Sequence, residues 1–229
     1  MALVVHSPSN LAQYVSCPRK YWGQRAKLIQ WKETPQKLRG TAVHAALEQA
    51  VKDGPQAVKA WPDGIAHIYT QSVISDLRKQ ALTAQLFTEH EMCVNDKYVS
   101  TGWWDDDAML RAKADLILLW PDHAFIGDWK TGKIYPDSDL QLRVEALLVH
   151  VLYKVPVVNW SLFYVDYSQT KSGVVDFTKG VQQVEDIVLL MQKIKNLVET
   201  GGAFLPKKNK FCKWCDLYHG MYCEDSKGW

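Results

Sequence analysis

The sequence predicts an α/β protein: a mixed central β-sheet flanked by helices, with a helical N-terminal region and a cysteine-clustered C-terminus. Helical periodicity dominates up to residue 88, period-two alternation follows, and three of the five cysteines fall in the last eighteen residues. The chain has 229 residues, of which 47% are apolar and 23% are charged. This length and composition suit one large domain and exclude a disordered chain.

Helix signals come first along the chain. A helix is predicted from Ser7-Pro8, where a capping hydroxyl precedes an early proline, and Pro18 should interrupt it. A second helix is predicted over residues 34–53, because it starts at Thr-Pro and stops at a glycine. Residues 55–87 are also predicted to be helical, with a break at 61–64.

Strand signals begin near residue 91. The apolar residues Ala112, Ala114, Leu116 and Leu118 alternate along one segment, and a Trp-Pro-Asp-His turn then indicates a hairpin. The predicted elements in chain order are strands 91–94, 110–120 and 124–130, a crossover helix 137–153, strands 158–167 and 173–177, and a helix 181–200 closed by two glycines.

The charge pattern is uneven although the net charge is only +2. Residues 1–60 carry nine Lys or Arg against three Asp or Glu, residues 61–200 carry thirteen against nineteen, and residues 201–229 carry five against three. These basic ends fit ordinary solvated faces as well as a binding surface. No apolar run approaches the ~18 residues of a membrane helix. No cationic stretch opens the chain as in a secretory signal, so we expect a soluble, cytoplasmic protein without a membrane partner.

Two acidic residues in neighbouring strands form the first candidate site. Asp115 lies in an apolar strand, where an unpaired carboxylate is costly, and Asp128 and Lys130 project from one face of the next strand. A hairpin between the strands would bring the two carboxylates together as a hard-oxygen site for Mg²⁺ or Mn²⁺. The lysine could then orient a water or neutralise charge on a phosphate. An ordinary Asp–Lys ion pair is the alternative.

Cysteines near the C-terminus form the second candidate site. Cys212-x-x-Cys215 followed by Cys223 offers three soft ligands, and the odd total of five argues against a disulfide framework. Two residues are candidates for the fourth ligand. His219 would complete a local Zn²⁺ site, whereas Cys17 would complete the four thiolates that an iron–sulfur cluster requires.

The acidic motif resembles the PD-(D/E)xK nucleases, and specifically their RecB-like exonuclease branch. Asp115 matches the first acid, Asp128 the second and Lys130 the lysine, within Asp-Trp-Lys-Thr-Gly. Upstream, the segment that ends at His44 is similar to the branch's Gly-x-x-x-His helix, whose histidine is a metal ligand. The resemblance implies a restriction-endonuclease-like core.

Two flanking segments extend the resemblance. Gln141 matches the start of the branch's Gln-x-x-x-Tyr helix, although Glu145 replaces the tyrosine. The segment 16–22 resembles the Cys-Pro-x-x-aromatic element of iron–sulfur members, such as AddB-type helicase–nucleases and the CRISPR-adaptation exonuclease. In those proteins one N-terminal and three C-terminal cysteines hold a [4Fe–4S] cluster. The resemblance implies the same cluster here, on Cys17, Cys212, Cys215 and Cys223, as a structural staple.

The resemblance implies a metal-dependent DNA exonuclease that hydrolyses phosphodiester bonds at single-stranded or duplex ends, with single-stranded ends preferred. DNA repair, recombination, phage DNA processing and CRISPR adaptation are the implied settings, in a bacterium or a phage-infected host. His44, Asp115, Asp128 and the Trp129 carbonyl would hold Mg²⁺ or Mn²⁺, with Lys130 and Gln141 completing the catalytic set. The alternative is a non-catalytic DNA-binding scaffold with a structural zinc site.

The resemblance also sets the expected organisation. We expect one nuclease domain over residues 1–229, and we leave open a homo-oligomer or a recombination or adaptation partner protein. Within the domain we expect a helical part at 34–88, a catalytic sheet core at 89–178, a helix at 179–200, and an iron–sulfur region formed by 7–25 with 203–225.

Overall fold

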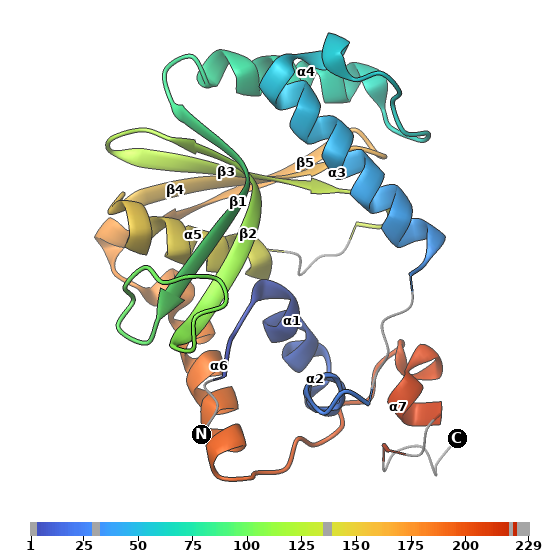
Figure 1. Cartoon of the computed structure of the whole chain (residues 1–229), viewed down its shortest axis with the longest axis vertical. Coiled ribbons are helices and arrows are strands. Elements are labelled where there is room, and N and C mark those ends of the chain that lie inside the picture. Colours follow the sequence, from blue (N-terminus) through green and yellow to red (C-terminus); the bar gives the residue numbers. More distant parts are fainter. Residues whose placement is uncertain (1–3, 29–32, 135–138, 220–221, 224–229) are drawn as a thin grey trace.

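The computed structural model describes residues 4–28, 33–134, 139–219 and 222–223. Helices precede, interrupt and follow one sheet (Figure 1). In chain order the elements are α1 (Pro8–Ser16), α2 (Pro18–Arg25), α3 (Pro35–Asp53), the 3-10 turn η1 (Pro55–Ala57), α4 (His67–Gln80), β1 (Gln85–Asn95), β2 (Ala108–Leu119), β3 (His123–Lys130), α5 (Leu140–Tyr153), β4 (Val157–Tyr164), β5 (Gln169–Asp176), η2 (Phe177–Lys179), α6 (Gln182–Glu199), η3 (Cys212–Trp214) and α7 (Asp216–His219).

The five strands form one mixed sheet in the order β1-β2-β3-β4-β5. The first three strands pair antiparallel, β4 pairs parallel to β3, and β5 returns antiparallel to β4. A parallel pair requires a crossover connection, and α5 supplies it between β3 and β4. The predicted mixed sheet flanked by helices is therefore confirmed.

Helices cover both faces of the sheet. On one face, Leu148 of α5 and Ile187 of α6 belong to the larger core, together with residues of α1. On the other face, Leu47 of α3 and Ile74 of α4 pack in a second core against β2 and β3. Figure 1 shows α3 and α4 on the opposite side of the sheet from α1 and α6. The site described below lies where α3 and α5 approach the same strands.

Caps account for the helix boundaries near the N-terminus. The Ser7 hydroxyl accepts a hydrogen bond from the Asn10 N–H at the start of α1. Cys17 has extended φ and ψ angles and separates α1 from α2, which starts at Pro18. The predicted interruption at this proline is confirmed. Thr34 caps α3, which stops where Gly54 adopts a φ of 98°. The predicted limits of this helix are confirmed.

Strand β1 departs from the prediction. We expected helix up to residue 87 and a strand only over 91–94, but β1 starts at Gln85. Leu86 and Phe87 lie opposite Leu118 and Ile117 of β2, and this pairing with a distant segment overrides the local helical pattern. The expected boundary between helical part and sheet core is therefore displaced by a few residues.

The apolar alternation of β2 also departs from the prediction. Ala112 and Ala114 contribute to the core beneath α5, whereas Leu116 and Leu118 contribute to the core beneath α3. The change of face occurs at Asp115. The predicted start of the crossover helix at Asp137 lies outside the described residues.

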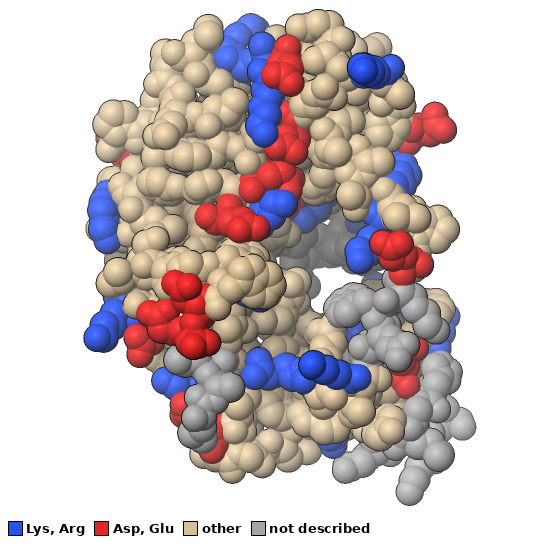
Figure 2. Space-filling view, in the orientation of Figure 1, with Lys and Arg blue, Asp and Glu red and all other residues tan. Residues whose placement is uncertain are grey.

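One face of the molecule carries charged side chains of both signs next to a hollow. Figure 2 shows acidic and basic side chains beside one another, above a hollow between the part around α3 and the part around α1 and α2. None of the described helices combines the length and the hydropathy needed to cross a bilayer.

Candidate active site

Three side chains from three elements converge beneath α3. His44 of α3 places its Nδ1 3.2 Å from Asp115 Oδ2 on β2. Glu89 of β1 completes the group, in which the three ligand atoms lie within 4.8 Å of one another. Within the described ranges it is the one set of three His, Cys, Asp or Glu side chains this close together. The group lines a cleft of about 490 Å³ together with Gly40 and Lys113.

Glu89 is the residue that the sequence analysis missed. The register of β1 with β2 places it opposite Asp115, between the pairs Thr88–Leu116 and His90–Ala114. Like charges opposite each other repel, so the pair needs a compensating cation. Lys113 partly provides one, since its Nζ lies 2.5 Å from Glu89 Oε2. Glu89 also holds a φ of 48°, a strained value for a side chain other than glycine.

A second group forms around Asp128. Continuing the β2–β3 register by one residue from Leu116–Gly127 places Asp128 opposite Asp115. Its side chain is 1% exposed, and its Oδ2 lies 2.7 Å from Lys130 Nζ. Lys130 also donates to Gln141 Oε1 at 2.8 Å, and Gln141 Nε2 donates to Asp128 Oδ1 at 2.6 Å. Asp128, Lys130 and Gln141 therefore meet in space, while Asp128 stands outside the close group of His44, Asp115 and Glu89.

Trp129 connects the two groups through its backbone. Its N–H donates to Asp115 Oδ2 at 2.9 Å. The residue is 2% exposed, and its ring centroid lies 5.0 Å from that of Phe163, in the core beneath α3. The side chain is thus structural, and a role of the Trp129 carbonyl as a metal ligand stays a prediction.

Burial and crowding shift the proton affinities in this region. Burial raises the pKa of Asp128 to about 6, although the charge of Lys130 opposes the shift. Burial raises the pKa of Glu145 well above its ordinary value, and the charge of Asp128 adds to this. Burial lowers the pKa of His44, but the hydrogen bond and charge of Asp115 outweigh it and the net shift is upward. Because carboxylates this close together repel one another when ionised, they favour the binding of a cation.

An ion pair orients α3 relative to the sheet. The guanidinium of Arg39 donates to both carboxylate oxygens of Asp166 at 2.9 and 2.7 Å. Asp166 also accepts the N–H of Gly132 at 2.9 Å. Burial raises the pKa of Asp166, but the bonds from Arg39 outweigh it and the net shift is downward. This pair joins the helix that carries His44 to the turn that follows Lys130.

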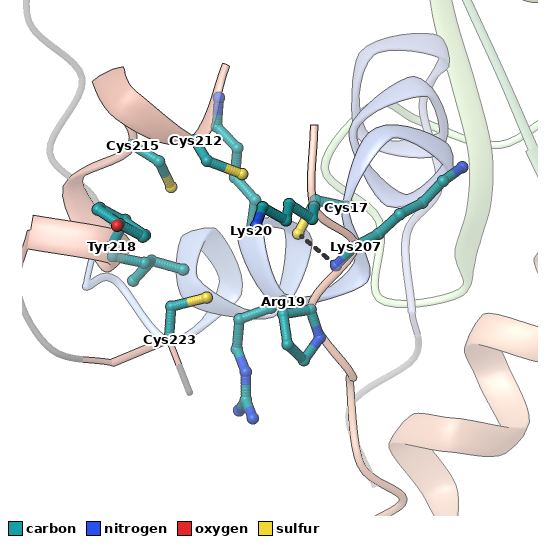
Figure 3. A pocket seen from close by; sticks show the side chains of 11 residues that line it. Cys17, Arg19, Lys20, Lys207, Cys212, Cys215, Tyr218 and Cys223 are labelled. Atoms are coloured by element: carbon teal, nitrogen blue, oxygen red, sulfur yellow. Dashed lines mark hydrogen bonds between the residues drawn. The ribbon is translucent and has the colours of Figure 1, made fainter. Parts of the chain in front are cut away.

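Four cysteines gather at the other end of the molecule. Cys17, Cys212, Cys215 and Cys223 line one pocket, and Figure 3 shows their side chains around it. The Lys207 N–H donates to Cys17 Sγ at 3.4 Å, and the Asn209 N–H donates to Cys212 Sγ at 3.3 Å. The side chain of His219, the alternative fourth ligand, lies outside the described part of the structure.

Comparison with known proteins places the chain in a family. The model of the PD-(D/E)XK nuclease superfamily matches residues 5–219. The chain belongs to the PD-(D/E)XK nuclease superfamily. No curated protein sequence matches it. The crystal structure of SSO0001 is 13% identical and covers 90% of this chain and 94% of that chain, but its TM-score of 0.31 is too low to add to the assignment.

Membership in the PD-(D/E)XK nuclease superfamily indicates a metal-dependent nuclease, and hence a DNA substrate. The chemistry of the donor set fits this assignment. Imidazole and carboxylate groups from His44, Asp115 and Glu89 lie close enough to share a cation, and carboxylate oxygens suit Mg²⁺ or Mn²⁺.

Proposed function

We propose that the protein is a DNA exonuclease that hydrolyses phosphodiester bonds in the presence of Mg²⁺ or Mn²⁺, starting from single-stranded ends. The observation that carries the proposal is the meeting of His44 and Asp115 with the buried Asp128–Lys130 pair on adjoining strands. Membership in the nuclease superfamily supports hydrolysis of DNA, while the exonuclease mode and the strand preference follow from the RecB-like resemblance.

The residues divide into ligands and positioning groups. His44, Asp115, Asp128 and the Trp129 carbonyl would hold the cation, and the position of Glu89 adds a carboxylate to this set. When bound, the cation polarises the scissile phosphate and lowers the pKa of a water.

Lys130 has the role that depends most on its surroundings. Its ammonium is held by Asp128 and Gln141, and from this position it would orient the attacking hydroxide. Burial lowers the pKa of Lys130, but the charge and hydrogen bond of Asp128 outweigh this, and the net upward shift keeps the ammonium protonated. Lys130 therefore acts as a charged hydrogen-bond donor and does not take up a proton.

The basic ends of the chain supply a track for the DNA backbone. Lys20 and Lys207, far apart in sequence, line the same pocket and bring the two basic ends together. Next to this pocket in sequence, Trp214 is 67% exposed and Lys213 Nζ lies 4.1 Å from its ring centroid. Cationic groups beside an exposed aromatic ring suit the backbone and bases of a single strand.

A cleavage assay tests the proposal. End-labelled single-stranded and duplex DNA are incubated with Mn²⁺ and with wild type, Lys130→Ala or Lys133→Ala, the last removing a nearby lysine outside the site. We expect mononucleotides and short products from wild type and Lys133→Ala, and no cleavage by a folded Lys130→Ala variant. Equal cleavage by wild type and Lys130→Ala would refute the catalytic role of Lys130. Circular DNA, which has no ends, is tested in parallel, and its cleavage would show an endonuclease in place of an exonuclease.

We also propose that the four pocket-lining cysteines hold a [4Fe–4S] cluster that staples the two ends of the chain. A tetrahedral zinc site with Zn–S bonds of ~2.3 Å places its sulfur atoms ~3.8 Å apart. Across the described residues, no three cysteine sulfur atoms lie within 4.8 Å of one another. A cubane binds each thiolate to a different iron atom and so suits a wider arrangement. The N–H groups directed at Cys17 and Cys212 are of the kind that tune such clusters.

Metal analysis tests the cluster. Anaerobically purified wild type should be brown, absorb broadly near ~400 nm and contain iron. Cys17→Ser should lose iron and stability, whereas Cys93→Ala, which changes a cysteine buried in the sheet, should keep its iron. A colourless protein that contains zinc would instead favour the scaffold alternative.

A further inference from the structure

The side chain of Glu145 is buried beside the site and has no role in the mechanism above. It projects from α5 one turn after Gln141 and is 0% exposed. Its Oε1 accepts a hydrogen bond from Gln141 Nε2 at 2.9 Å, and its Oε2 lacks a partner among the described residues. Burying a carboxyl group so incompletely bonded is costly, and an apolar side chain of similar size would avoid that cost. Glu145 therefore requires an explanation other than stability.

The bonds around Gln141 fix the direction of its amide. Its Nε2 faces two carboxylate acceptors, on Asp128 and Glu145, and its Oε1 accepts from Lys130. Rotating the amide by half a turn would set NH₂ against an ammonium and the carbonyl against two carboxylates. The surroundings therefore allow one orientation only.

Glu145 and Asp128 do not hold Gln141 equally well during the reaction. Asp128 also pairs with Lys130 and is one of the proposed ligands. Its two oxygens are therefore shared among Gln141, Lys130 and the cation. Glu145 lies outside the group formed by His44, Glu89 and Asp115, and its bond to Gln141 uses no oxygen of Asp128. This bond can therefore persist when Asp128 binds another group. Gln141 in turn keeps Lys130 in place.

We propose that Glu145 is a positioning residue that fixes the Gln141 amide and, through it, holds the Lys130 ammonium in place to orient the attacking hydroxide. The inference rests on the proposed nuclease function and deepens it. It assigns a use to the glutamate that this chain carries where the RecB-like branch has tyrosine.

The test uses the whole protein and three changes. Glu145→Leu removes the acceptor and keeps the volume, Glu145→Gln keeps an acceptor oxygen, and Gln141→Leu removes the group through which Glu145 would act. A displaced catalytic group typically lowers the rate by up to ~100-fold. We expect Glu145→Leu to cleave ~10–100-fold more slowly at saturating Mn²⁺ and DNA, with KM for DNA and calorimetric Mn²⁺ affinity unchanged. Glu145→Gln should restore most of the rate.

Two further readouts separate positioning from a structural role. The melting temperature of Glu145→Leu should equal or exceed that of wild type, because a costly buried carboxyl group is lost while activity falls. The double variant Gln141→Leu/Glu145→Leu should be no slower than Gln141→Leu alone, because both changes break one chain of contacts. Glu145→Met serves the same purpose if the leucine variant does not fold.

Three outcomes would overturn the inference: a wild-type rate in Glu145→Leu, multiplicative losses in the double variant, or a loss that follows unfolding. In each of them wild type still cleaves and Lys130→Ala does not, so the nuclease proposal survives. A wild-type protein that cleaves no DNA would overturn both proposals.

Discussion

Replacing Asp128 with asparagine should stabilise the metal-free protein at neutral pH. Burial, opposed by Lys130, raises the pKa of Asp128 from 3.8 to about 6. A carboxyl group with a higher pKa in the folded state holds its proton more tightly there, so ionisation costs stability. The cost starts near pH 4, grows with pH and levels off above about pH 6. At ~1.4 kcal/mol per pH unit, this gap corresponds to ~3 kcal/mol.

Urea unfolding in EDTA between pH 4 and pH 8 measures the effect. The free energy of unfolding of Asp128→Asn minus that of wild type should rise with pH to ~1–3 kcal/mol at pH 7. The gain falls toward the lower value to the extent that Lys130, left without its charged partner, destabilises the variant. Asp122→Asn is the control, since Asp122 is exposed and the hydrogen bond from His123 lowers its pKa. This variant should show no such rise.

Mn²⁺ should reduce this difference, because a ligand bound only to the folded state at 100 times its Kd adds ~2.7 kcal/mol. Wild type would gain this stabilisation, and Asp128→Asn would gain less. A stability difference that stays flat or falls as the pH rises would show that Asp128 is not held at such a cost, and would refute the reasoning.

Two other predictions concern the ion pair of Arg39 and the exposed ring of Trp214. Arg39→Leu should lower the free energy of unfolding by ~1–3 kcal/mol at pH 7, because it removes both hydrogen bonds to Asp166. Since the pKa of Asp166 is lowered, this loss should shrink as the pH falls below about 4 in urea titrations, and a loss that is constant with pH would contradict the ion pair. Trp214→Ala should weaken binding of a single-stranded oligonucleotide by ~1–3 kcal/mol in fluorescence anisotropy with Ca²⁺ in place of Mn²⁺. Trp104→Ala, which changes a ring that is 83% exposed in the β1–β2 loop, should bind as wild type does; equal losses would count against the basic track.

The sequence predicted those parts of the fold that local chemistry determines. Thr34 and Gly54 mark both ends of α3, and the hairpin turn after β2 sets the register that places Asp115 opposite Asp128. Both signals act over a few residues, so no knowledge of the packing was needed. The approach of His44 was expected from the family resemblance alone, and the structure places it beside Asp115.

The remaining features depend on contacts between distant segments. Glu89 was missed because the helical pattern before it hid the first half of β1, and only pairing with β2 places it opposite Asp115. Glu145 stood out in the sequence only as a departure from the branch's tyrosine. Its bond to Gln141 joins neighbours on α5, but the importance of that bond depends on how the crossover lays α5 against β3.

Anomalous diffraction from crystals soaked in Mn²⁺ would test the central claim most directly. The claim is that side chains from α3, β2 and β3 hold one catalytic cation. We predict a manganese peak within bonding distance of His44, Asp115 and Asp128, and its loss in crystals of Asp115→Asn. A peak elsewhere, or none at a concentration that supports cleavage, would contradict it.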